Sequence, residues 1–198
     1  MNSKTQRLIG LTGGIATGKT TVSNYLREKY HLPILDADVY SREAVSRDSP
    51  ILDIIFARYG DKLKLANGTL ARSKLGQIIF NDSVEKQWLE SQIHPYVRDR
   101  FEQDLQNITS DTVILDIPLL FEAKLTNTVT EIWVVSCDYS LQTKRLQKRN
   151  NLSLNQVEAR INSQIPLREK VAAADVVLDN NQDLAYLYTQ IDKAVNLV

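Results

Sequence analysis

The sequence predicts an α/β fold in which helices cover both faces of one five-stranded parallel sheet. Several short segments are apolar along their whole length, as expected for strands that are buried on both faces. These segments alternate with segments of helical periodicity, as crossovers between parallel strands require. A glycine-rich segment also joins the first apolar run to the first helical pattern. A chain of 198 residues is long enough to form one domain with a sizeable core.

The individual strands follow from the apolar runs. The predicted strands, in chain order, are Arg7–Thr12, Pro33–Asp36, Thr112–Ile117, Glu131–Ser136 and Asp175–Leu178. The last helix is predicted over Leu184–Val195, where apolar residues recur at helical spacing and form one stripe.

Two segments depart from the simple alternation of strand and crossover. Residues 39–110 are mostly helical by pattern and longer than a crossover needs, so we expect a helical insertion, which is a good place to bind a substrate. Residues 143–170 are rich in Lys and Arg and follow the fourth strand, where parallel sheets present their ligand-binding edge. We predict that they form a mobile basic lid. Residues 1–38, 111–142 and 171–198 remain as the core of the same domain.

Not every basic residue of the predicted lid needs a function. A solvated helix face explains Lys144, Lys148 and Lys170 equally well, and we favour it for these three. On spacing alone, the choice stays open for Arg145, Arg149 and Arg160.

Composition excludes several classes of protein. The 24 Lys and Arg residues balance the 24 Asp and Glu residues, which argues against a general binder of nucleic acids or acidic membranes. No long apolar segment predicts a signal peptide or a membrane span, so we expect a cytoplasmic protein. Cys137 ends an apolar strand and is interpreted as a packing residue, with a nucleophile as the alternative. We expect a monomer or a weak homo-oligomer.

The strongest local signal is the run from Gly13 to Thr20, which fits the phosphate-binding pattern G-x-x-x-x-G-K-[ST]. A predicted strand precedes this run and a helical pattern follows it, which is the context that the pattern requires. Glycines let backbone amides approach phosphate oxygens, and the helix N-terminus adds its positive dipole end. Lys19 supplies a cation for the outer phosphates, and the Thr20 hydroxyl is a ligand for Mg²⁺. The alternative is a glycine-rich turn that binds nothing.

Two carboxylates lie at or near the ends of predicted strands. Asp38 comes just after the second strand, where it either accepts a proton from an attacking hydroxyl or caps the next helix. Asp116 ends the third strand, where it acts on Mg²⁺ or its water shell, contacts the acceptor, or has a structural role. His94 precedes Pro95 in the insertion, and by itself it indicates a turn cap or a core residue as readily as a binding residue. No group of residues has the spacing of a zinc site.

Taken in order, the motifs resemble the dephospho-coenzyme A kinase family over essentially the whole chain. The matching segments are Ile9–Ile15, Gly18–Thr21, Asp36-Ala37-Asp38 with Arg42, Ile93-His94-Pro95 with Arg98, Asp116–Glu122, Arg145, Arg149, Arg160-Ile161, Gln164, Ala174–Val177 and Asn180. The phosphate-binding run alone is common to many activities, whereas its combination with the D-x-D, H-P-x-x-R and D-I-P-L-L-F-E motifs is far more specific.

The resemblance implies a P-loop fold similar to nucleoside monophosphate kinases. It also implies ATP- and Mg²⁺-dependent phosphorylation of the ribose 3′-hydroxyl of dephospho-CoA, the last step of coenzyme A synthesis. Asp38 then matches the presumed catalytic base, and Lys19 and Arg145 complete the expected catalytic set. The residues implied in nucleotide binding are Gly14, Ile15, Ala16, Thr17, Gly18, Lys19, Thr20, Thr21, Arg149 and, near the adenine, Asn180. Those implied on the acceptor side are Thr12, Asp38, Arg42, His94, Arg98 and Asp116.

The sequence departs from the family pattern at three places. Ala16 replaces the usual third glycine, Thr20-Thr21 replaces Ser-Thr, and no glycine stands two residues after Asn180. Two other functions remain open: a kinase for another small molecule on the same core, and a GTPase-like switch. The switch needs an N-K-x-D run to bind guanine, and the closest run here, Asn180–Asp183, lacks the lysine.

Overall fold

A computed structural model of the chain describes residues 6–196. Residues 1–5, part of the amino-terminal region in which no signal peptide was predicted, lie outside the described residues. The chain divides into two compact units, described separately below: one comprises residues 1–36 and 109–198, the other Ala37–Ile108.

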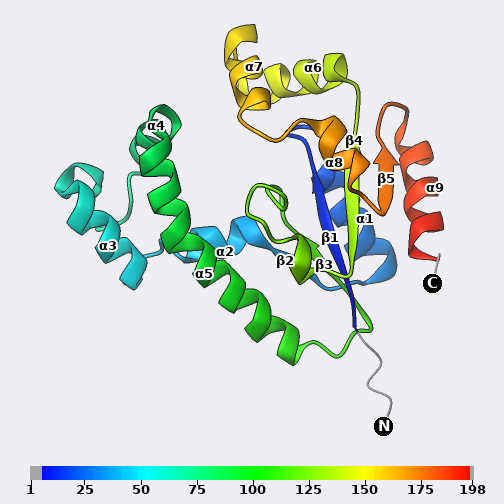
Figure 1. The fold of residues 1–198 in the computed structure, drawn as a ribbon, viewed down its shortest axis with the longest axis horizontal. Helices are drawn as coiled ribbons and strands as arrows, with labels where there is room; N and C mark the ends of the chain where they lie inside the picture. Colours follow the sequence, from blue (N-terminus) through cyan, green and yellow to red (C-terminus); the bar gives the residue numbers. More distant parts are fainter. Residues whose placement is uncertain (1–5, 197–198) are drawn as a thin grey trace. The chain divides into compact units, whose positions relative to one another are not determined.

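The first unit contains the predicted five-stranded parallel sheet, which confirms the fold class (Figure 1). Its strands are β1 (Arg7–Gly13), β2 (Ile34–Asp36), β3 (Thr112–Asp116), β4 (Glu131–Ser136) and β5 (Val176–Asp179), in the spatial order β2-β3-β1-β4-β5. Every pairing is parallel, and Asp36 lies opposite Asp116 in the register of β2 and β3. The predicted strands agree to within a residue at each end.

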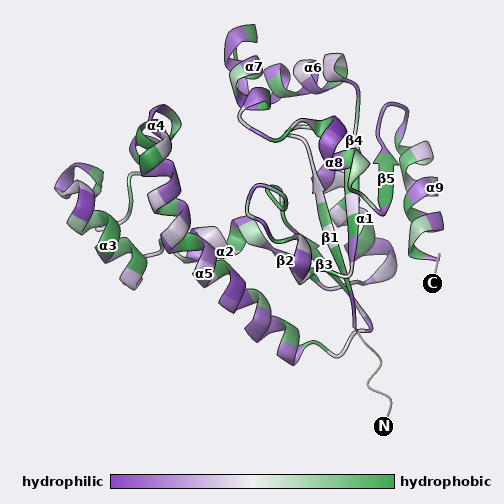
Figure 2. Ribbon diagram, in the orientation of Figure 1, coloured by the Kyte–Doolittle hydropathy of each residue, from purple (hydrophilic) through white to green (hydrophobic). Residues whose placement is uncertain are grey.

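Five helices of more than one turn accompany this sheet. They are α1 (Lys19–Tyr30), α6 (Tyr139–Asn150), α7 (Leu154–Asn162), α8 (Leu167–Ala172) and α9 (Leu184–Val195). Helices α1 and α9 contact each other and share one core with the strands, centred on the fully buried Trp133. In Figure 2 the strands are coloured mainly as hydrophobic, whereas α7 is mainly hydrophilic. Burial of apolar surface against the sheet is therefore what holds α1 and α9 in place.

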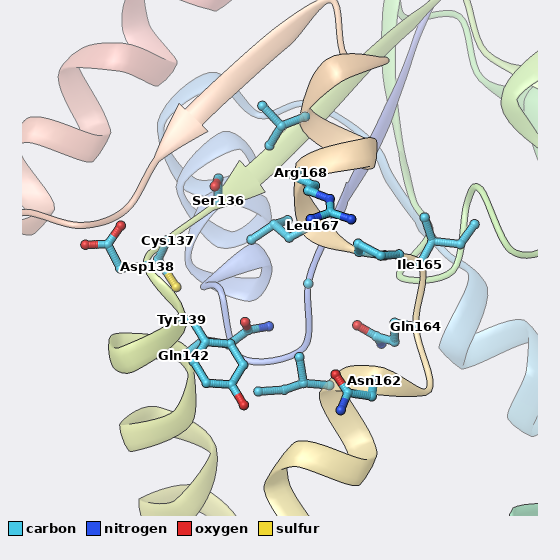
Figure 3. Close-up of a pocket in the computed structure, with 14 residues that line it drawn as sticks. Ser136, Cys137, Asp138, Tyr139, Gln142, Asn162, Gln164, Ile165, Leu167 and Arg168 are labelled. Carbon is cyan, nitrogen blue, oxygen red and sulfur yellow. The ribbon is translucent and has the colours of Figure 1, made fainter.

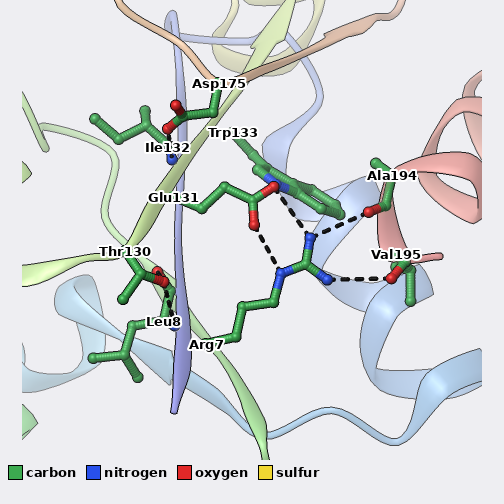
Figure 4. A network of polar contacts seen from close by, with 9 residues as sticks. All are labelled: Arg7, Leu8, Thr130, Glu131, Ile132, Trp133, Asp175, Ala194 and Val195. Carbon is green, nitrogen blue, oxygen red and sulfur yellow. Dashed lines mark hydrogen bonds and ion pairs between the residues drawn. The ribbon is translucent and has the colours of Figure 1, made fainter. Parts of the chain in front are cut away.

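The amino-terminal end of the sheet carries a network of polar contacts (Figure 4). The Arg7 guanidinium pairs with Glu131, with 2.7 Å between Nε and Oε2. It also donates to the carbonyl oxygens of Ala194 and Val195, which end α9. The Trp133 indole N–H donates to Glu131 Oε1 over 2.7 Å. Arg7 thus joins β1 to β4 and supplies donors to carbonyls that a helix C-terminus leaves unpaired.

The second unit is helical. It comprises α2 (Ala37–Glu43), α3 (Pro50–Tyr59), α4 (Arg72–Asn81) and α5 (Ser83–Asn107). Its own core contains Leu52, Ile55, Leu63, Leu75 and Leu89, all buried. Helix α5 extends over 25 residues with Pro95 inside it.

Candidate active site

The glycine-rich loop joins β1 to α1, as predicted. Ala16 has a φ of 62° and Gly18 a φ of 109°, both in the left-handed region that favours glycine. A Cβ on Gly13 would lie 2.6 Å from the Val135 carbonyl oxygen, and one on Gly18 would collide with the Asn180 side chain. The loop can therefore take this path only with glycine at these two positions, whereas Ala16 retains its methyl group under backbone strain.

Polar side chains from distant segments hold the loop. The buried Asn180 donates from Nδ2 to the Thr17 carbonyl oxygen over 2.7 Å. Arg145 donates to the carbonyl oxygens of Thr17 and Asn180, at 3.4 and 3.2 Å. The Thr17 hydroxyl closes the loop on the Gly14 carbonyl oxygen. Asn180, expected beside the adenine, thus has its side-chain amide occupied by the loop. Arg145 lies beside the loop, and its role toward the triphosphate stays a prediction.

Lys19 and Asp116 form an ion pair at the carboxyl end of the sheet. The Asp116 side chain is only 4% exposed, and burial raises the pKa of its carboxyl above the ordinary value, while the Lys19 ammonium acts in the opposite direction. Asp36, opposite on β2, adds a second negative charge that also raises the Asp116 pKa. Thr12 lies nearby in β1, where its buried hydroxyl donates to the Pro118 carbonyl oxygen.

Three side chains at the carboxyl end of the sheet offer oxygen atoms that could bind a metal ion. Thr20 is exposed in the first turn of α1, and Asp36 and Asp116 end neighbouring strands. Hydroxyl and carboxylate oxygens suit Mg²⁺, which binds through few protein ligands and retains water. Among residues 6–196, no group of three or more His, Cys, Asp and Glu side chains is arranged to hold a metal ion. The donor set thus fits a metal that is shared with bound phosphates.

In the helical unit, Asp38 and Arg42 line one cavity of about 330 Å³. Asp38 is the second residue of α2, so it is a first-turn acid and not the residue that precedes the helix as its cap. The apolar wall of the cavity includes Leu75 and Ile93, and the exposed Arg72 completes its charged rim. Arg72 Nη2 donates to the Arg42 carbonyl oxygen over 3.0 Å. The structure therefore adds Arg72 to the acceptor-side candidates, and no motif in the sequence singled it out.

His94 and Arg98 lie one turn apart on α5, on either side of Pro95. His94 is half-buried and Arg98 is exposed. The described residues lining the 330 Å³ cavity include their neighbour Ile93 but neither His94 nor Arg98. The structure does not gather these two residues with Asp38 and Arg42 at that cavity.

A larger cavity of about 800 Å³ lies beside the phosphate-binding loop (Figure 3). Its lining includes Gly14, Gln142, Gln164 and Arg168. Cys137 also borders it but is only 5% exposed, and burial raises the pKa of its thiol. A buried thiol with a raised pKa is a poor nucleophile, which favours the packing role.

The remaining basic residues of the segment 143–170 differ in their surroundings. Lys144, Lys148, Arg149 and Arg160 are exposed. Lys170, by contrast, is fully buried, and its Nζ lies 2.7 Å from Glu122 Oε1. The interpretation of Lys170 as part of a solvated helix face is therefore wrong, because a buried ammonium needs a charged partner and a surface lysine does not.

The parallel sheet, the glycine loop and the paired lysine together define a protein of the phosphate-loop class. The shikimate kinase of Acinetobacter baumannii shares this fold, with a TM-score of 0.54 at 17% identity over 98% of this chain and 93% of that one.

The particular family follows from closer relatives. The sequence model of the dephospho-CoA kinase family matches residues 7–185. The dephospho-CoA kinase of Trichormus variabilis is 60% identical over 97% of this chain and 98% of that protein. A solved Thermus thermophilus protein is 30% identical with a TM-score of 0.84, and each chain is covered to 98%. The dephospho-CoA kinase of Campylobacter jejuni is 27% identical with a TM-score of 0.71, over 95% of this chain and 94% of that one. The chain belongs to the dephospho-CoA kinase family, which confirms the resemblance.

Proposed function

We propose that this protein transfers the γ-phosphoryl group of ATP to the ribose 3′-hydroxyl of dephospho-CoA, giving coenzyme A and ADP. Membership of the dephospho-CoA kinase family supports the reaction. The observation that carries the proposal is the Lys19–Asp116 pair beside the glycine loop, since it holds the loop's cation at the edge of the sheet where ligands bind.

The backbone amides of the loop bind the triphosphate in this proposal. The nucleotide site comprises Gly14, Ile15, Ala16, Thr17, Gly18, Lys19, Thr20 and Thr21. The Lys19 ammonium turns from Asp116 toward the β- and γ-phosphate oxygens. The freed Asp116 carboxylate then contacts the acceptor, or would bind water ligands of a metal ion. The Thr20 hydroxyl would hold a Mg²⁺ ion, and such an ion would neutralise charge on the phosphate oxygens.

Basic residues of the lid complete the nucleotide site. Arg145 already lies beside the loop, within hydrogen-bonding distance of the Thr17 carbonyl oxygen. From there its guanidinium stabilises charge that develops on the transferred group. Arg149 is exposed one turn further along α6, and we assign it to the outer phosphates.

The helical unit binds the acceptor in this proposal. Asp38 accepts the proton of the 3′-hydroxyl and orients that oxygen in line with the γ-phosphorus. Arg42 and Arg72 bind the anionic part of dephospho-CoA, because guanidinium groups match phosphate geometry and both border one cavity with an apolar wall. His94, Arg98 and Thr12 stay assigned to the acceptor side by family resemblance.

The balanced charge of the chain supports the proposal that it acts on a small molecule and does not bind nucleic acid. Within residues 6–196 no helix has both the length and the apolar character needed to cross a bilayer. We propose a cytoplasmic enzyme that acts as a monomer or a weak homo-oligomer.

One experiment tests the assignment of Asp38. The purified protein is incubated with ATP, Mg²⁺ and dephospho-CoA, the product is identified by mass, and turnover of Asp38→Asn is compared with the wild type. We expect kcat to fall by roughly 10²–10⁴-fold, the usual contribution of a general base. Asp53→Asn is the matched control, because Asp53 is an exposed first-turn acid of α3 in the same unit. Near-normal turnover of Asp38→Asn contradicts the assignment, and faster ADP release with a nucleoside monophosphate contradicts the acceptor.

A further inference from the structure

Two glutamines hold the backbone of Ile15 within the phosphate-binding loop. Gln142 Nε2 donates to the Ile15 carbonyl oxygen over 2.7 Å, and the Ile15 N–H donates to Gln164 Oε1 over 2.9 Å. Figure 3 shows both side chains beside the 800 Å³ cavity, Gln142 from α6 and Gln164 from the segment between α7 and α8. Both polar groups of one loop residue are therefore occupied by side chains from outside the loop.

These two bonds act where the loop is strained. The Ile15 N–H and carbonyl belong to successive peptide planes, and fixing both determines the path of the chain into Ala16. Ala16 has a φ of 62°, a conformation that an alanine occupies reluctantly. A glycine at this position would have no such preference to overcome. The glutamines thus hold the loop in a conformation that its own sequence does not favour.

Gln142 has little freedom to move. Gln142 is only 3% exposed. It lies on α6 close to Arg145, which donates to the Thr17 carbonyl oxygen of the same loop. A buried amide that lost its partner would carry the cost of an unsatisfied donor. Gln142 therefore resists any rearrangement of Ile15 that breaks this bond.

Gln164 is held through its backbone. The next residue, Ile165, donates its N–H to Glu122 Oε1 over 3.0 Å. The same carboxylate oxygen lies 2.7 Å from Nζ of the fully buried Lys170. An ion pair with the buried Lys170 thus anchors the segment that presents Gln164 to the loop.

We propose that Gln142 and Gln164 are positioning residues that preset the phosphate-binding loop for ATP by fixing both peptide planes of Ile15. They act through the loop and do not touch the acceptor, so their loss weakens ATP binding and leaves the affinity for dephospho-CoA unchanged. The inference rests on the proposed binding of ATP by this loop, but not on the identity of the acceptor.

The test uses methionine, which matches glutamine in length but offers no amide. Gln164→Met, Gln142→Met and the control Gln147→Met are compared with the wild type. Gln147 lies on α6 and makes no hydrogen bond with its side chain among the described residues. Hydrogen exchange of the Ile15 amide, followed by NMR without nucleotide, reports the Gln164 bond directly. Steady-state kinetics and calorimetry report KM and Kd for ATP.

We expect Gln164→Met to speed Ile15 exchange and to raise KM and Kd for ATP by about three- to tenfold, the equivalent of one hydrogen bond. Gln142→Met raises KM for ATP similarly, and the KM for dephospho-CoA stays within about twofold in both variants. Gln164→Glu keeps an acceptor oxygen and so keeps the Ile15 amide protected. Gln147→Met behaves as the wild type.

Unchanged Ile15 exchange in Gln164→Met overturns the proposal, because the bond is then absent in solution. Faster exchange with an unchanged affinity for ATP also overturns it, because the glutamines are then structural only. If the wild type binds ATP but does not phosphorylate dephospho-CoA, the proposed function fails while the Ile15 and ATP measurements still decide this inference.

Discussion

Single residues decide whether the phosphate-binding loop can form. Lys19 and Thr20 were predicted from a local pattern because each acts within a few residues of the glycines. The sequence did not predict that the loop is held by Asn180, Gln142 and Gln164. These residues contact the loop from segments more than a hundred residues away. No local spacing encodes such contacts, and only the folded chain reveals them.

Gly18→Ala tests whether the Asn180 side chain leaves room for a Cβ at position 18. The φ of 109° penalises any side chain by about 1–2 kcal/mol, and the new Cβ also collides with the Asn180 amide. We expect a larger loss of stability in urea unfolding than strain alone causes, together with loss of ATP binding in calorimetry.

Gly68→Ala is the matched control for that variant. Gly68 has a φ of 81°, and no atom lies within 4 Å of the position that a Cβ would take, so the substitution adds strain without a collision. Equal destabilisation of the two variants, with ATP binding retained in both, would show that Asn180 does not restrict this position.

At the scale of elements, the strands were predicted well because each is a short apolar run with its own signal. Their predicted and observed ends differ by at most one residue. Ile117, for example, lies just beyond β3, although its N–H still donates to the Leu11 carbonyl oxygen of β1. The helices of residues 39–110 were predicted only as one helical segment. Helical periodicity alone does not show where α3 ends and α4 begins, because those ends depend on Gly60 and on contacts within that unit's core.

The junction of α3 and α5 predicts a dependence on pH. Arg58 binds both carboxylate oxygens of Glu85 at 2.8 Å, and the Tyr59 hydroxyl donates to the same carboxylate. The Arg58 guanidinium, followed by the Tyr59 hydroxyl, lowers the pKa of Glu85 from 4.5 to about 2. Because the folded state lowers this pKa, the stabilisation is present above pH 4.5 and is lost as the pH falls toward 2.

Glu85→Gln measures that contribution. We expect the melting temperature of the wild type to exceed that of the variant near pH 6, and the difference to shrink as the pH falls below 4.5. The effect is small, since the pair is solvent-exposed. Glu102→Gln, an exposed glutamate of α5, should show no such convergence. A constant difference between wild type and Glu85→Gln across this range would refute the assignment.

At the scale of the whole molecule, each of the two units has a hydrophobic core of its own among residues 6–196. The proposed ATP site belongs to the unit with the sheet, and the proposed site for the acceptor's anionic part belongs to the helical unit. From the sequence, residues 39–110 were predicted as a helical insertion within one domain, because they interrupt the alternation of strand and crossover. The sequence did not indicate Arg72, because an arginine at a helix start resembles any solvated surface residue.

Arg72→Met tests whether the helical unit binds the acceptor separately from ATP. Loss of one charge-assisted contact to an anionic acceptor should raise KM for dephospho-CoA about tenfold or more. The Kd for ATP in calorimetry should not change. Arg47→Met removes the same charge from an exposed position of the same unit and should leave both constants unchanged. Weaker ATP binding in Arg72→Met, or an unchanged KM for dephospho-CoA, would contradict the assignment.

The contacts around Arg7 have a practical consequence for engineering. They join β1, β4 and the last turn of α9 at one rim of the sheet, while the strained glycine loop follows the far end of β1. A strand of 7 residues separates the two, which is roughly 20 Å. Because the two features lie at opposite ends of β1, we expect substitutions that strengthen the contacts around Arg7 to raise the melting temperature without changing the affinity for ATP.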